Sequence, residues 1–163
     1  MDLVKIAEEI RTRLRLTGVW KMIALCVAMA ACAPAADFAL AIANSVAGNS
    51  FQAKGAVLVV RPEGCADPAK ARIEGTAEGL VNGARRSVPL KLAALKTPGV
   101  FAVFKEWPPE GVWVVKLTGT CQGATAGVVT PIGPKGFIRE SSKFFSRAAG
   151  EAEVEASLKS LVK

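Results

Sequence analysis

Residues 72–92, RIEGTAEGLVNGARRSVPLKL, carry the strongest fold signal in the chain. Small or apolar residues alternate with charged and polar ones over Arg72–Glu78, which is the period of a half-buried strand. Asn82-Gly83 follows and favours a type I′ hairpin turn, because both residues tolerate positive φ. Residues 87–92 alternate again and form the return strand. Pro89 cannot donate a ladder hydrogen bond, so we expect this strand at a sheet edge or with a bulge.

Four further segments have strand character: 56–60, 100–104, 112–118 and 124–130. Glycine and proline turns separate them, and none has a helical period. A series of short strands at this spacing is typical of an all-β sandwich or barrel. We therefore predict a mainly β protein whose antiparallel β-sandwich domain spans residues 55–163.

The end of the chain changes period. Val154, Leu158, Leu161 and Val162 fall on one helical stripe. Glutamates precede the stripe and lysines follow it, which suits the helix dipole. The sequence predicts a C-terminal α-helix at about 150–162 that docks on the sandwich or on a partner.

Residues 22–36, MIALCVAMAACAPAA, predict export. A short apolar core follows basic residues and runs into Ala33-Pro34-Ala35, where a signal peptidase would cut. Residues 1–35 are thus the predicted signal segment, and 36–54 a flexible lead with small side chains. Two alternatives stay open: an uncleaved anchor, and lipid attachment at Cys32, since Met29–Cys32 resembles a bacterial lipobox.

Composition excludes several kinds of chemistry. The chain contains no histidine and no tyrosine. A Ser-His-Asp or Cys-His catalytic site, a His-ligated metal and an imidazole pH switch are therefore ruled out. We predict no metal and no cofactor. The net charge of +7 falls to +5 without residues 1–35, which hold five basic and three acidic side chains. A moderately basic protein of this kind favours anionic partners.

Four cysteines are present, and Cys26 and Cys32 lie in the export segment. Cys65 and Cys121 remain. In an exported protein such a pair forms a disulfide by default. A metal site or a redox pair is disfavoured, because the two residues supply neither four ligands nor a Cys-X-X-Cys spacing.

Residues 106–121, EWPPEGVWVVKLTGTC, resemble the late-strand hairpin of bacterial periplasmic immunoglobulin-like domains. The resemblance rests on a Pro/Gly corner followed by Gly-x-Trp-x-Val-x-Leu-x-Gly. It implies an immunoglobulin-like sandwich, and the spacing of Cys65 and Cys121 is similar to that of an intersheet disulfide. Many functions share this architecture, so the resemblance implies no particular ligand.

Candidate binding residues lie in two places. Trp113 alternates with apolar neighbours and is expected in the core, whereas Trp107, beside two prolines, is either an exposed binding platform or a corner-packing residue. Basic residues also recur every fourth position at Lys135, Arg139, Lys143 and Arg147. On a helix they would form one positive stripe opposite phenylalanines, as either a solvated face or a surface for an anionic partner.

Catalysis has weak support. Glu106 and Glu110 flank a turn and could be paired acids, and Ser141-Ser142 could supply a nucleophile. Nothing in the sequence indicates that they converge, so we predict no catalytic residue.

The sequence thus predicts an exported, non-catalytic binding or assembly module of the envelope or periplasm. Its partner would be a protein or an anionic envelope component and not a nucleic acid, with membrane contact only through an uncleaved N-terminal anchor. An envelope protein anchored by that segment or by lipid, and a hydrolase of unknown substrate, are the alternatives.

Overall fold

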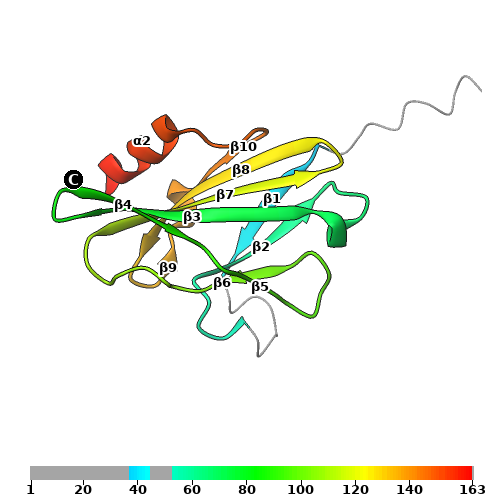
Figure 1. Ribbon diagram of the computed structural model, residues 1–163, viewed down its shortest axis with the longest axis horizontal. Coiled ribbons are helices and arrows are strands. Elements are labelled where there is room, and N and C mark those ends of the chain that lie inside the picture. Colours follow the sequence, from blue (N-terminus) through cyan, green and yellow to red (C-terminus); the bar gives the residue numbers. More distant parts are fainter. Residues whose placement is uncertain (1–36, 45–52, 163) are drawn as a thin grey trace, which may run out of the picture. The chain divides into compact units, whose positions relative to one another are not determined.

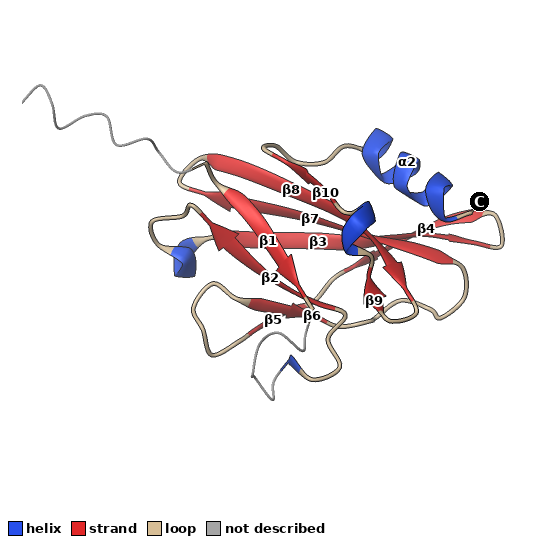
Figure 2. Ribbon diagram, turned by 180° about the vertical axis from the view of Figure 1, so that it is seen from behind, coloured by secondary structure: helices blue, strands red, loops and turns tan. Residues whose placement is uncertain are grey.

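The computed structural model describes residues 37–44 and 53–162. These residues form a β-sandwich of two antiparallel sheets with a C-terminal helix, as predicted (Figures 1 and 2). Sheet A has the strand order β1-β2-β6-β5, and sheet B has the order β10-β8-β7-β3-β4, with β9 paired to β8. The predicted signal segment, residues 1–35, lies outside the described residues.

The residue bounds of the strands and helices are as follows, sheet by sheet. Sheet A contains β1 (Ala39–Ala43), β2 (Leu58–Glu63), β5 (Leu92–Ala94) and β6 (Phe101–Val103). Sheet B contains β3 (Arg72–Val81), β4 (Ala84–Pro89), β7 (Val112–Cys121), β8 (Ala124–Gly133), β9 (Gly136–Phe137) and β10 (Lys143–Phe145). Two 3-10 turns, η3 (Pro68–Lys70) and η4 (Arg139–Ser141), and the helix α2 (Glu151–Leu161) complete the fold.

The hairpin β3–β4 forms where the sequence predicts it. Asn82 and Gly83 have φ angles of 51° and 78°, the left-handed pair that a type I′ turn requires. The strand β4 is an edge of sheet B, which confirms the position expected from Pro89. The return strand begins and ends earlier than predicted, however: it spans Ala84–Pro89, and the chain then crosses to sheet A to form β5 from Leu92.

The predicted flexible lead, 36–54, is wrong in part. Ala39–Ala43 forms β1, which pairs with β2 along its whole length. Phe38, Leu40 and Ile42 alternate with alanines and point into the core. The small alanines give the segment little strand propensity, but its alternation of large and small apolar residues is that of an edge strand with one buried face.

The main core lies between the two sheets. It gathers fully buried residues from both, among them Leu58 and Val60 of β2 and Val115 and Leu117 of β7. A second apolar cluster lies on the outer face of sheet B, where α2 covers it. Its buried members are Val114, Val129, Ala149, Val154 and Leu158.

The disulfide between Cys65 and Cys121 joins the two sheets. Cys65 follows β2 of sheet A and Cys121 ends β7 of sheet B, with their Cα atoms 6.0 Å apart. The distance lies within the range expected for a bridged pair, so the predicted pairing is confirmed. The bond therefore links the two sheets at the C-terminal ends of β2 and β7.

Candidate binding surface

The two tryptophans pack against each other at one end of the sandwich. Trp113 of β7 is 3% exposed and Trp107 is 4% exposed, with ring centroids 6.1 Å apart and planes tilted by 34°. The Nε1 of Trp113 donates a 2.8 Å hydrogen bond to the carbonyl oxygen of Glu110. Trp113 is thus a core residue, as predicted. Trp107 is not an exposed platform: it has the corner-packing role, because the rigid Pro108-Pro109 turn folds its ring onto Trp113.

A hollow of about 450 Å³ opens beside this tryptophan pair. The loop before β7, the turn after β8 and the end of α2 form its walls. Its lining is mainly apolar and includes Trp107, Pro109, Trp113, Ile132, Ile138 and Leu161. Among the residues that the structure describes, Lys105 is the only charged one in this lining. The sequence did not reveal this hollow, because the walls come from segments far apart in the chain.

The basic segment 135–147 is not an α-helix, so its four cations do not form the single stripe that their spacing would give on one. The segment instead supplies β9, η4 and β10. The physical reason is the free edge of β8, whose backbone groups need partners. Lys143–Phe145 pairs with Gly127–Val129, and the Ile138 amide donates to the Pro131 carbonyl at 2.8 Å. Tertiary hydrogen bonding has overridden the fourfold spacing of the charges.

Three of the four predicted cations are nevertheless available for binding. Lys135, Arg139 and Lys143 are exposed and make no ion pair or hydrogen bond in the described part of the chain. Arg147 differs, because it pairs with Glu153 and lies over the Phe145 ring, 5.2 Å from its centroid. Arg147 therefore helps to hold the start of α2 and is not a free binding residue.

An exposed aromatic ring adjoins this basic segment. Phe144, next to Lys143 in β10, is 56% exposed. It lies opposite Val128, and directly opposed residues of antiparallel strands share a face, so its side chain is on the face of sheet B turned toward sheet A. The side chain of Phe145 is on the other face of sheet B and packs in the apolar cluster beneath α2.

Arg139 also borders a second hollow, of about 530 Å³, over the outer face of sheet A. The floor consists of small and apolar residues such as Ala41, Val59 and Val100, and Arg61 is the other charged lining residue. The free guanidinium of Arg139 therefore stands at the margin of a concave surface.

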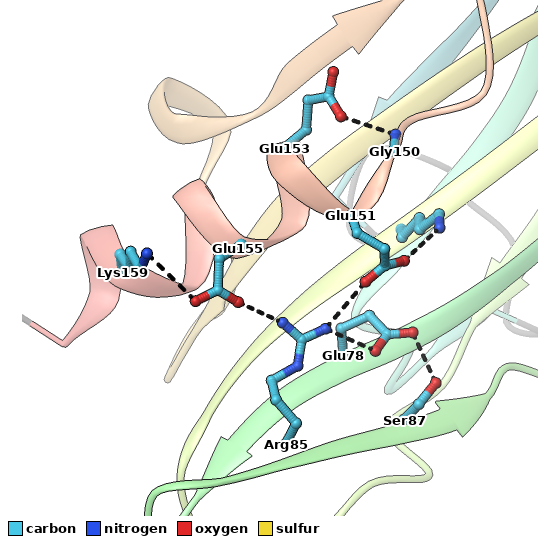
Figure 3. Close-up of polar contacts among 9 residues, drawn as sticks. Glu78, Arg85, Ser87, Gly150, Glu151, Glu153, Glu155 and Lys159 are labelled. Carbon is cyan, nitrogen blue, oxygen red and sulfur yellow. Dashed lines mark hydrogen bonds and ion pairs between the residues drawn. The ribbon is translucent and has the colours of Figure 1, made fainter.

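The arginine of the β3–β4 hairpin has a different role. Arg85 is the centre of a polar network that fastens α2 to sheet B (Figure 3). Its Nη1 lies 2.8 Å from Glu155, and its Nη2 lies 3.3 Å from Glu78 and 3.4 Å from Glu151. Lys116 of β7 adds a 3.2 Å ion pair to Glu151. These charges are engaged within the domain.

Glu78 is the buried member of this network, with 7% exposure. Burial by itself raises the pKa of its carboxyl, but hydrogen bonds from Ser87 and Thr76 and the charge of Arg85 outweigh burial and leave the pKa below its usual value. The Ser87 hydroxyl donates at 2.7 Å. The carboxylate is therefore held ionised beneath α2.

The start of α2 is capped by its own residues. Glu153 accepts a 2.9 Å hydrogen bond from the Gly150 amide, and Arg147 pairs with the same carboxylate. The hydrogen bond from Arg147 is the main reason that the pKa of Glu153 is lowered. Ionised Glu153 then satisfies an amide that the first turn leaves without a helical partner.

The residues considered for catalysis have other surroundings. Glu106 is exposed and lies 4.0 Å from Lys91, and Glu110 is exposed. Ser142 bonds to the Thr130 hydroxyl at 2.7 Å and to the Ile138 carbonyl at 2.9 Å, while Ser141 is exposed. None of the four side chains lines either of the hollows described above.

No helix in the described ranges has both the length and the apolar character needed to cross a bilayer. No protein-family model matches the chain, and no curated protein or solved structure is significantly similar to it. The surface itself is therefore the basis for any statement about function.

Proposed function

We propose that this protein is an exported, non-catalytic module of the envelope or periplasm that binds an anionic partner. The observation that supports the proposal is the set Lys135, Arg139 and Lys143, three successive cations of one segment that are exposed and unpaired. Seven other cations in the described ranges are held in ion pairs: Arg61, Lys70, Arg85, Lys91, Lys116, Arg147 and Lys159.

Two further observations support the proposed export from the cytoplasm. The Cys65–Cys121 disulfide suits an oxidising compartment, where such bonds persist. The apolar segment that ends in Ala33-Pro34-Ala35 suits a signal peptidase. The proposal includes kinship with periplasmic immunoglobulin-like domains, on the strength of residues 106–121. Mass measurement of protein from the periplasmic fraction should give a mature N-terminus near Ala36, and intact cytoplasmic protein beginning at Met1 would overturn export.

The binding proposal is tested with polygalacturonate, a carboxylated polysaccharide, as the probe. The triple variant Lys135→Ala, Arg139→Ala, Lys143→Ala is compared with the unaltered protein by titration at low salt. Exposed charge pairs contribute up to about 1 kcal/mol each, so the affinity should fall on the order of 10- to 100-fold. Added salt should weaken the binding of the unaltered protein, because exposed charges are screened.

The matched control is the triple variant Arg72→Ala, Arg86→Ala, Lys96→Ala. These cations are also exposed and unpaired, and the control has the same net charge as the test variant. It should bind almost as the unaltered protein does. Equal losses in both variants would mean that only net charge matters, and no binding by the unaltered protein would remove the anionic-partner proposal.

A further inference from the structure

The hollow beside Trp107 and Trp113 has the rigidity of a preformed ligand site. The two tilted rings pack against each other, and the hydrogen bond from Trp113 to the Glu110 carbonyl fixes the second ring. Pro109 and Pro134 line the same hollow and restrict their own loops. A site whose walls are already ordered loses little conformational entropy when a ligand enters.

The tryptophans do not suit a sugar. A sugar ring stacks on an open aromatic face, but the two side chains are only 4% and 3% exposed. They line the hollow together with Ile132, Ile138 and Leu161, with little ring surface exposed. Such a lining favours an aliphatic chain, which needs contact area but neither a flat ring face nor hydrogen-bond partners.

Lys105 favours a ligand with a negative charge. Its side chain is exposed and makes no ion pair or hydrogen bond, and among the described residues no carboxylate side chain lines the hollow. An anionic head group at the mouth would meet this ammonium group while its apolar tail lies inside.

We propose that this hollow binds a single-chain amphiphile with a carboxylate head, its aliphatic tail between the tryptophan pair and Leu161 and its head at Lys105. The volume of about 450 Å³ lies within the range of about 300–1,000 Å³ usual for small-molecule sites. The site is additional to the polyanion surface of the proposed function. It uses a different probe and different variants, so either proposal can fail alone.

The first test is a chain-length series. Hexanoate, octanoate and decanoate are titrated into the purified protein by calorimetry, below their micelle concentrations. Each additional buried methylene contributes about 0.8 kcal/mol, so the affinity should rise about fourfold per methylene until the hollow is full. Saturation should occur at one ligand per chain. Affinity that does not depend on chain length, or binding that does not saturate, overturns the proposal.

The second test fills the hollow. Ile138→Trp and, separately, Leu161→Trp should each abolish decanoate binding, whereas Ile138→Val should retain it. Circular dichroism and urea unfolding show which variants keep the fold. The two variants alter different segments, the end of α2 and the residue before η4, so failure of one leaves the other informative. Decanoate binding that survives in both folded variants places the ligand elsewhere and refutes the site.

The third test concerns the head group. Lys105→Met should weaken decanoate binding about two- to fivefold, since the contact is an exposed charge pair. Lys96→Met removes an equally exposed and unpaired ammonium group away from the hollow and should have no effect. Equal affinities in the two variants would contradict the placement of the carboxylate at Lys105.

Discussion

Replacing Leu158 with alanine tests whether α2 is an integral part of the domain. Leu158 is 2% exposed and packs with Val154 against Val114 and Val129 on the outer face of sheet B. Truncation of a buried leucine to alanine destabilises a protein by about 2–5 kcal/mol. The site lies beneath a single helix that can partly settle into the space, so we expect a loss of about 3 kcal/mol, in the lower part of that range.

The assay is urea unfolding of the purified protein at neutral pH with the disulfide intact. A slope of about 1–3 kcal/mol per molar urea turns a loss of 3 kcal/mol into a shift of the midpoint of about 1–3 M. Circular dichroism follows α2, and tryptophan fluorescence follows the main core around Trp107 and Trp113. The two signals should change together, because an isolated helix of this length is marginal in water.

Lys159→Ala is the control at an exposed position of the same helix. Lys159 is exposed and lies 3.6 Å from Glu155, a helical pair of a kind that contributes about 0.3–0.5 kcal/mol. Its midpoint should hardly move. If Leu158→Ala shifts the midpoint no more than this control does, or if the helical signal is lost well before the fluorescence changes, α2 is an independent arm and the docking argument is wrong.

Three other perturbations have definite expected outcomes. Cys121→Ala should lower the free energy of unfolding by about 2–4 kcal/mol relative to the unaltered protein, with both measured under non-reducing conditions. An unchanged value would contradict the bridge. Gly79→Ala should lower the free energy of unfolding by about 1–3 kcal/mol, because a β-carbon would lie 2.5 Å from the packed Trp113 ring. Calorimetric melting measures this loss, and an unaltered melting temperature would show that the ring moves aside. Since the pKa of Glu78 is lowered in the folded state, its stabilising contribution is present above the unfolded pKa, near 4.5, and disappears as the pH falls through the folded value. The loss of stability between pH 7 and pH 3 should therefore be smaller in Glu78→Gln, and equal losses in both proteins would refute this role.

Local patterns in the sequence were enough for much of the fold. The alternation around Asn82-Gly83 predicted a hairpin because turn chemistry and strand period are properties of neighbouring residues. The helical stripe of Val154 and Leu158 predicted α2 for the same reason. The disulfide between Cys65 and Cys121 followed from the number of cysteines left after the predicted export segment, and it required no knowledge of topology.

The candidate site was predicted only in part. Exposure of Lys135, Arg139 and Lys143 agrees with their charge, which strongly opposes burial. Their spacing would give one stripe on a helix, but the segment that carries them forms β9, η4 and β10 instead. Trp107 was placed at a turn correctly, but whether a turn tryptophan faces water or a neighbour depends on what the turn folds against.

The tertiary structure alone decided the remaining features. Ala39–Ala43 became a strand and 143–145 became β10 because open sheet edges present backbone groups that need hydrogen-bond partners. Local periodicity does not show which edge is open. The chain also changes sheet between Pro89 and Leu92, and the hollow beside Trp113 is assembled from four separate segments. Such features depend on contacts between residues distant in the sequence, whereas strand period, turn type and helix face depend only on residues a few positions apart.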